Sequence, residues 1–391
     1  MSLDTPPSPG PAPDPVAELR AALAVPFERG AAMPKSVYTS PAFLKLEQDR
    51  IFAREWVCAG RASRLKAPGD FLTLRIAGEP VIVLRDHGGT VRALSNVCRH
   101  RMSTLLEGEG HVRAIACPYH AWTYNLDGTL RGAPGMGLND SFERSEIRLP
   151  PVRCEVWEGW IMVTLNPDAA PVAERMAPLH DLIGQYGMAD YVETFHETFR
   201  WNTNWKVLGE NFMESYHLPA CHAGTIGGHV SLEEMTCPEG FEAFNFHWIL
   251  KNDSATLALA HPANTRLTGE DRRKTWLVSV YPQLFVTLTP GYFWYLSLMP
   301  AAPGEVDVLY GGGLSPEWAA DPDAERHFAD LKDLLDRVNE EDKGCTERVY
   351  RGLLSRLGAP GPLSHLERPN REFAEWILRR VDEAPGGPAP A

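Results

Sequence analysis

Two short motifs, Cys98-Arg99-His100 and Cys117-Pro118-Tyr119-His120, place four metal-binding side chains in one stretch of the chain. Sixteen residues separate His100 from Cys117. Thiolates and imidazoles are ligands for zinc and for iron. Two Cys-His pairs at this spacing are typical of two loops that meet around one site, so this pattern constrains the fold more than any other feature.

Three interpretations fit the four residues: a structural zinc site, a Rieske [2Fe–2S] cluster, and unliganded core residues. Zinc modules usually separate the two ligands of a pair by two to four residues, whereas one residue separates Cys98 from His100. In a Rieske cluster two thiolates hold one iron and two imidazoles hold the other, which raises the reduction potential. The spacing and the following Trp122 favour the Rieske cluster, and therefore electron transfer.

Composition limits the other possibilities. The 391 residues suggest about two domains. A net charge of -13, from 51 Asp and Glu against 38 Lys and Arg, argues against a nucleic-acid partner. No apolar run is long enough to span a membrane, and the N-terminus lacks the features of a signal peptide. We therefore expect a cytoplasmic protein without a membrane anchor, in which the five cysteines outside the two motifs are free thiols.

Hydrophobic patterning predicts the domains. Residues 1–40 are expected to be disordered or extended, as is the proline-rich tail. Residues 41–165 combine a helix with short alternating runs typical of an antiparallel β domain. In residues 166–391, strand-like segments alternate with helical ones, which predicts an α+β domain. The helices expected are 41–54, 172–186 and 322–354, and the strands are 70–76, 80–85, 92–94, 160–165, 192–201, 241–250, 275–289, 292–299 and 306–312.

A second constellation lies in the α+β region. His217 and His222 are five positions apart and follow carboxylates at Glu210 and Glu214. Such a group can supply part of the two-His, one-carboxylate triad that binds Fe(II) and leaves coordination positions open. Taken alone, these residues favour the solvated face of a helix over a metal site, but beside the first motif they favour an iron site.

With both motifs, the chain resembles the α subunit of the Rieske non-heme iron oxygenases over about residues 38–380. The resemblance implies an N-terminal Rieske β-sandwich domain and a C-terminal helix-grip catalytic domain. It further implies a terminal oxygenase that takes electrons from a reductase or ferredoxin, and ultimately from NAD(P)H, to activate O2 and oxidise a small organic substrate. The family commonly assembles as a head-to-tail homotrimer.

Site residues follow from the resemblance. Asp342 is expected to be the third iron ligand, whereas Glu340 and Glu341 are expected on an exposed helix face. Glu214 stands where the family usually has an Asp that bridges a cluster histidine of one subunit to an iron-ligand histidine of the next. The implied ligands are Cys98, His100, Cys117 and His120 for the [2Fe–2S] cluster and His217, His222 and Asp342 for mononuclear iron.

The substrate is less constrained. The motifs Glu210-Asn-Phe-x-Glu-x-Tyr-His and Glu341-Asp-x-x-Cys-Thr-Glu resemble the branch that oxidises quaternary ammonium compounds such as choline, betaines and carnitine. Hydroxylation of an aromatic ring or aromatic acid is the alternative, and an electron carrier without oxygenase activity is a more remote one. Aromatic residues that either form a cation–π cage or belong to the core are Phe244, Phe246, Trp248, Trp276, Tyr292, Trp294 and Tyr295.

Overall fold

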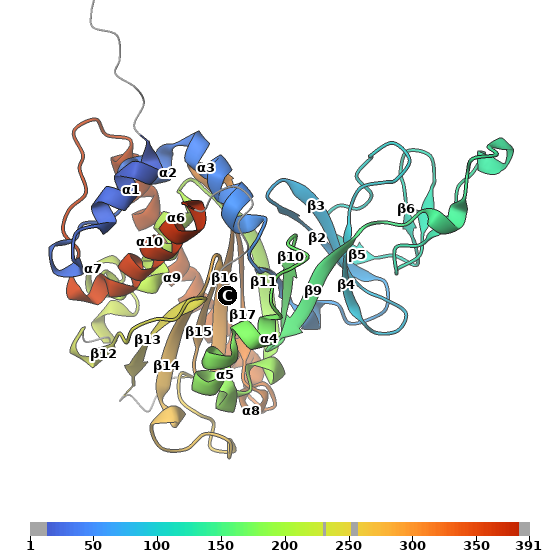
Figure 1. Ribbon diagram of the computed structural model, residues 1–391. Coiled ribbons are helices and arrows are strands. Elements are labelled where there is room, and N and C mark those ends of the chain that lie inside the picture. The colour runs from blue at the N-terminus through green and yellow to red at the C-terminus, as the bar shows by residue number, and fades with distance from the viewer. Residues whose placement is uncertain (1–13, 230–231, 252–256, 383–391) are drawn as a thin grey trace, which may run out of the picture.

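The computed structural model describes residues 14–229, 232–251 and 257–382, and these form two lobes (Figure 1). In this part of the chain, each lobe is built on a seven-stranded antiparallel sheet. The first sheet has the order β1-β10-β9-β4-β3-β2-β5, and the second has the order β11-β17-β16-β15-β14-β13-β12. The α+β class with a β-rich first lobe, expected from the patterning, is confirmed.

The first lobe carries both Cys-His motifs. Alternate side chains of β3 (Glu79–Arg85) pack on opposite faces of its sheet, Val81 and Val83 on one and Ile82 and Leu84 on the other. The second of these faces packs against the motif loops and a small three-stranded sheet. The strands of this lobe are β1 (Val57–Arg61), β2 (Asp70–Ile76), β3, β4 (Val91–Ser95), β5 (Glu109–His111), β6 (Ile115–Ala116), β7 (Thr123–Tyr124), β8 (Leu130–Gly132), β9 (Pro151–Trp157) and β10 (Trp160–Thr164).

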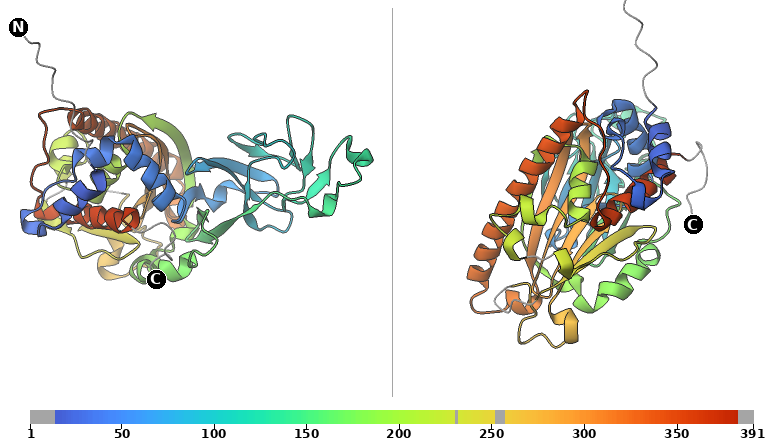
Figure 2. Two further views of the ribbon diagram at one scale, coloured as in Figure 1. Left: turned by 45° about the horizontal axis from the view of Figure 1, so that its top comes forward. Right: turned by 90° about the vertical axis from the view of Figure 1, so that its left-hand side faces the viewer.

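The second lobe is a sheet covered on both faces. One face packs against α6 (Trp205–Met213), α9 (Ala324–Leu353) and α10 (Arg368–Val381), and the other against α4 (Val172–Arg175) and α5 (Ala177–Ile183). Figure 2 shows α9 running along the sheet. The strands are β11 (Val192–Trp201), β12 (Met235–Thr236), β13 (Phe244–Leu250), β14 (Lys274–Val280), β15 (Leu284–Leu288), β16 (Tyr292–Ala302) and β17 (Glu305–Leu314).

The expected strand 275–289 is two strands. β14 and β15 pair with each other, and Val280 lies opposite Leu284. Residues 281–283 form the turn between them, and Pro282 lacks the backbone N–H that a continuous central strand needs. Uninterrupted apolar residues on both sides of the turn hid it in the sequence pattern.

The expectation of a disordered or extended segment over residues 1–40 is wrong from Asp14 onward. Two helices, α1 (Pro15–Leu23) and α2 (Lys35–Thr39), lead into α3 (Pro41–Glu47). The Asp14 carboxylate caps α1, and Leu19 is completely buried, because α1 packs on α10. The helices preceding β1 therefore belong to the second lobe, not to the first. Residues 1–13 and the tail 383–391 lie outside the described residues.

The expected boundary at residue 165 falls between β10 and α4. None of the helices in the described ranges combines the length and the apolarity that crossing a membrane requires.

Candidate metal centres and catalytic cavity

The two Cys-His motifs form two loops with the same backbone geometry. The backbone N–H of Met102 donates to the carbonyl of Cys98, and that of Ala121 donates to the carbonyl of Cys117, both at 3.0 Å. Met102 and Ala121 have positive φ values of 56° and 58°. Each loop thus closes a tight turn that presents a cysteine at its start.

The side chains of the loops divide into buried thiols and exposed rings. Cys98 and Cys117 are buried, whereas His100 and His120 are exposed with their ring centroids 4.7 Å apart. The ring of Trp122 stacks on His100 at 4.8 Å. Exposed histidines are not core residues, which removes the unliganded-core alternative for the imidazoles.

The Cys117 thiol has a lowered pKa. Burial raises this pKa, but hydrogen bonds from the backbone N–H groups of Tyr119 and His120 outweigh that effect. The loop therefore favours the thiolate, which is the form that binds a metal. Tyr124, a residue that sequence reasoning did not single out, places its Oη 3.3 Å from the Cys98 Sγ.

The geometry also bears on the zinc alternative. In the described residues, two groups of three or more His, Cys, Asp or Glu have ligand atoms within 4.8 Å of one another, and neither includes a loop residue. Ligands of a single zinc ion lie about 2.0–2.3 Å from it and so must converge more closely. The four loop side chains therefore do not converge as the ligands of a single zinc ion do.

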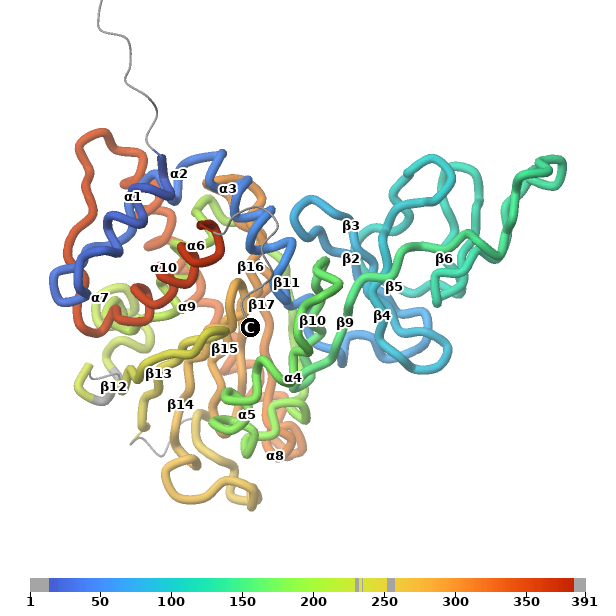
Figure 3. The backbone as a smooth tube through the Cα atoms, viewed as in Figure 1, coloured from blue at the N-terminus to red at the C-terminus, as the bar shows by residue number. Residues whose placement is uncertain are grey.

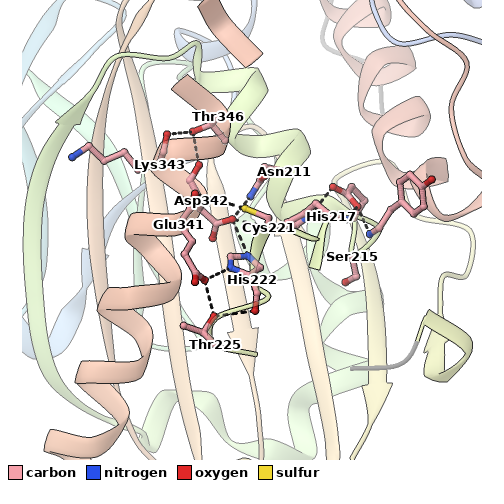
Figure 4. Close-up of polar contacts among 12 residues, drawn as sticks. Asn211, Ser215, His217, Cys221, His222, Thr225, Glu341, Asp342, Lys343 and Thr346 are labelled. Carbon is pink, nitrogen blue, oxygen red and sulfur yellow. Dashed lines mark hydrogen bonds and ion pairs between the residues drawn. The ribbon is translucent and has the colours of Figure 1, made fainter. Parts of the chain in front are cut away.

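One of those two groups is the second constellation of the sequence. His217 and His222 flank the single turn of α7 (Leu218–Cys221), and their ring centroids lie 5.2 Å apart. Each ring directs its Nε2 toward Oδ1 of Asp342, at 3.6 Å from His217 and 3.1 Å from His222 (Figure 4). The structure therefore brings together the three residues expected to bind iron.

Helical periodicity explains why Asp342 is the acid of α9 that meets the Nε2 atoms of the two histidines. The buried residues Leu331, Leu335 and Val338 mark the face of α9 that packs on the sheet, and Asp342 continues this stripe. Glu340 lies off the stripe and its side chain is 75% exposed, as expected. Glu341 was also expected to be exposed, but it contacts His222, and that expectation is wrong.

Each histidine has a carboxylate at its second nitrogen. The Nδ1 of His217 lies 2.6 Å from Glu214, and the Nδ1 of His222 lies 2.8 Å from Glu341. Asn211, which the sequence motif contained without an assigned role, donates from Nδ2 to Oδ1 of Asp342 at 2.8 Å. Metal-binding histidines commonly have such partners.

Electrostatics in this group favour a bound cation. Burial lowers the pKa of His217, but hydrogen bonds with Asp342 and Glu214 outweigh burial and raise it to about 10. Burial raises the pKa of Asp342, but hydrogen bonds with the two histidines lower it to about 2. Three carboxylates thus surround two imidazoles, an excess of negative charge that suits a divalent metal.

A cavity of about 110 Å³ opens beside the three converging residues. Its wall is mostly apolar, from residues such as Leu208, Ile249, Leu277 and Leu335, with Lys251 also at its border. The aromatic walls are Phe212 of α6 and Tyr292 and Trp294 of β16, whose alternate residues face this side of the sheet.

The other five aromatic residues considered for a cage do not line this cavity. All of them pack on the opposite face of the sheet, toward α4 and α5, with Trp248 at the edge of that cluster. The core interpretation is correct for these residues, which are Phe244, Phe246, Trp248, Trp276 and Tyr295.

Comparisons with known proteins agree with this geometry. The family described as Rieske [2Fe-2S] domain matches residues 55–143, and the family described as ring hydroxylating alpha subunit (catalytic domain) matches residues 188–383. The chain belongs to the Rieske oxygenases. The oxygenase therefore has a Rieske [2Fe–2S] domain and a catalytic domain of the type that contains mononuclear iron.

Relatives cover nearly the whole oxygenase. It is 31% identical to the glycine betaine monooxygenase oxygenase subunit of Pseudomonas aeruginosa, over 90% of this chain and 89% of the relative. It is 28% identical to the chloroplastic choline monooxygenase of Arabidopsis thaliana, over 89% of this chain and 82% of the relative.

Solved structures share the fold of the oxygenase. A quaternary ammonium Rieske monooxygenase superposes with a TM-score of 0.79 at 22% identity, over 92% of this chain and 97% of that one. Naphthalene 1,2-dioxygenase from Rhodococcus sp. superposes with a TM-score of 0.77 at 18% identity, over 94% and 98% of the two chains.

Proposed function

We propose that the oxygenase inserts one oxygen atom into a small quaternary ammonium compound of the betaine, choline or carnitine type, by hydroxylation or oxidative demethylation. The observation that carries this proposal is the small cavity beside His217, His222 and Asp342, whose aromatic walls are Phe212, Tyr292 and Trp294. The names of relatives along nearly the whole chain support the same substrate class.

Size and charge favour this class of substrate. We infer that the cavity of about 110 Å³ takes a compact group such as trimethylammonium. Aromatic faces attract quaternary ammonium groups, and the carboxylates of Glu214 and Asp342 border the same space.

The proposed roles of the metal-site residues follow from their positions. Asp342 and the Nε2 atoms of His217 and His222 bind iron, and Glu214 holds the Nδ1 of His217. When bound, the iron supplies O2 activation and the cluster supplies electrons. The apolar wall keeps bulk water away from the reacting methyl group, and Tyr292 and Trp294 orient that group. The cluster is held by Cys98, His100, Cys117 and His120.

Electron delivery is proposed to cross between subunits. The cluster loops and the His217–His222 segment lie in different lobes of one chain and far apart (Figure 3), and electron transfer weakens steeply with distance. The exposed His100 and His120 are available to a neighbouring copy. We infer a head-to-tail homotrimer, a closed ring of heterologous contacts, in which Glu214 links one cluster to the next iron. A reductase that oxidises NAD(P)H is the proposed donor.

A single turnover tests the proposal without the reductase. Chemically reduced, iron-loaded protein is mixed with O2 and with glycine betaine, carnitine, choline or an aromatic acid, and the products are identified by mass. We expect a demethylated amine with formaldehyde, or a hydroxylated quaternary amine. Oxidation of the aromatic acid alone would contradict the proposal.

A matched pair of variants tests the aromatic wall. Trp294→Leu should raise the KM for the quaternary amine, since it removes a cavity wall. Trp276→Leu alters the opposite face of the sheet, and it should change stability with little effect on that KM.

A further inference from the structure

We propose that Glu341 is a positioning residue for the iron site, which fixes the His222 ring so that its Nε2 lone pair points at the metal. The proposal rests on the proposed assignment of His222 and Asp342 as iron ligands. It gives a role to a residue that the sequence motif contains but that was expected to be exposed and is not one of the proposed ligands.

The Glu341 carboxylate is held by two donors. Its Oε2 lies 2.8 Å from the Nδ1 of His222 and accepts a hydrogen bond from the Thr225 hydroxyl at 2.6 Å. Thr225 is in turn anchored, because its backbone N–H donates to the carbonyl of His222 at 3.0 Å. Figure 4 shows these three side chains as one connected group between α9 and the loop after α7.

The opposite side of the carboxylate is also confined. A Cβ at residue 224 would lie only 3.1 Å from Glu341 Oε1, so glycine leaves room for the carboxylate there. The Cys221 thiol donates to the Glu341 carbonyl at 3.7 Å. Both the backbone and the side chain of Glu341 are therefore attached to the segment that carries His222.

This arrangement determines which nitrogen of His222 carries the proton. A neutral imidazole has one N–H and one lone pair. An anionic acceptor at Nδ1 holds the N–H there and leaves the lone pair on Nε2. That Nε2 lies 3.1 Å from Asp342, the residue next to Glu341. Two consecutive residues of α9 thus act on the His222 ring: Glu341 orients it, and Asp342 is the proposed ligand of the same metal ion.

The two histidines differ in the origin of this support. Glu214 lies three residues before His217 and holds it through a local turn, in which Glu214 Oε2 also accepts the backbone N–H of His217 at 3.1 Å. Glu341 reaches His222 from a helix more than a hundred residues away. The alignment of His222 therefore depends on the packing of α9 against α7, and Glu341 fixes that packing at the metal.

The test measures iron retention, which does not require a substrate. Iron-loaded protein is mixed with an excess of an Fe(II) chelator, and the rate of iron release is followed while the visible absorbance of the cluster reports on the first lobe and circular dichroism on the fold as a whole. Glu341→Ala should release iron about 10- to 100-fold faster than wild type. Glu341→Gln, whose amide oxygen can still accept the Nδ1 proton, should recover most of the retention.

Two controls separate the possible failures. Glu340→Ala removes a neighbouring exposed carboxylate of the same helix and should release iron at the wild-type rate. Asp342→Ala should lose the iron while keeping the cluster absorbance; if it kept the iron, the ligand assignment itself would be wrong. With that control in place, wild-type retention in Glu341→Ala would overturn the positioning role, as would equally fast release from the Ala and Gln variants.

Discussion

At the scale of single residues, the site is a set of carboxylates arranged around two imidazoles. Glu214 is the member that holds His217, and its side chain is only 10% exposed. Its Oε2 accepts the backbone N–H groups of Tyr216 and His217. These contacts keep the carboxylate in one orientation, which is the condition for an electron route through it.

Replacement of Glu214 tests that route. Glu214→Gln retains an acceptor for His217 and, after loading with excess iron, should contain wild-type amounts of iron and cluster. Its turnover should nevertheless fall by about 10- to 100-fold, with slower reoxidation of the cluster after mixing with substrate and O2. Reoxidation at the wild-type rate would remove Glu214 from the electron path.

Glu210 gives a prediction for pH dependence. Burial raises its pKa to about 7, although Tyr38 donates a hydrogen bond to its carboxylate at 2.8–2.9 Å. The folded protein therefore keeps Glu210 protonated at pH values where the unfolded chain ionises it. Below the pKa that Glu210 has in the unfolded chain, its protonation contributes fully to the free energy of unfolding. This contribution is lost as the pH rises through about 7, by about 3 kcal/mol in total.

Thermal unfolding of Glu210→Gln between pH 5 and pH 8 checks this. The variant should gain stability relative to wild type as the pH rises, because an amide does not ionise. Glu340→Gln, at an exposed position, should follow the wild-type pH profile. Parallel profiles for Glu210→Gln and wild type would contradict the raised pKa.

At the scale of helices and strands, a buried ion pair joins α3 to α6. The Lys206 Nζ lies 2.7 Å from Glu47 Oε1, and both side chains are completely buried. Trp205 donates from its indole to the second oxygen of Glu47 at 3.2 Å. α6 leads directly to Glu214 and His217, so this pair ties the N-terminal helices to the catalytic site.

Unfolding in urea measures the contribution of this ion pair to the free energy of unfolding. Lys206→Met alone should lower the free energy of unfolding by about 3–5 kcal/mol, because it leaves a buried carboxylate without its counter-charge. The double variant Lys206→Met, Glu47→Leu should recover a large part of that loss. A double variant as unstable as the sum of the single ones would show that the two side chains do not act as a pair.

The sequence predicted the bounds of several strands and one long helix closely. Alternation gave β2 and β11 at their observed bounds, and the apolar spacing of α9 predicted a long helix with Asp342 near its middle. Other elements escaped, since no range was expected for β1, β9, α6 or α10. α1 and α2 follow a proline-rich stretch whose composition masked the buried apolar residues Leu19, Val37 and Tyr38. The turn between β14 and β15 lies between two mostly apolar strands.

The candidate site was predictable for a similar reason, up to a limit. Ligand types and spacing pointed to His217 and His222, because the two histidines lie close together in the sequence. The contact of Glu341 with His222 was not predictable, since it depends on the orientation of α9 about its own axis where it packs against α7. The division of the aromatic residues between two faces of the sheet likewise needed the register of β13 to β16.

At the scale of the whole molecule, the two metal centres lie in separate lobes, and each is proposed to work with the centre of a neighbouring copy. This arrangement predicts complementation between two inactive variants. Cys117→Ala should lack the cluster, and Asp342→Ala should lack the mononuclear iron. Neither variant alone should turn over.

Co-expression of the two variants, followed by isolation of mixed trimers, should restore activity to about a third of wild type, because one of the three junctions in each mixed ring then pairs an intact cluster with an intact iron. Metal analysis and the mass of the oligomer provide the controls. Mixed trimers without activity would contradict electron transfer between subunits.

The position of α1 to α3 has a consequence for the ancestry and engineering of the chain. These helices precede β1 but belong to the catalytic lobe, so the cluster domain is an insertion within the sequence of its neighbour. The first and last strands of this insertion, β1 and β10, pair with each other, and Val57 lies opposite Val163. Because entry and exit lie side by side, we expect that this domain can be exchanged as one unit for that of a relative if the residues of β1 and β10 that pack on the catalytic sheet are kept.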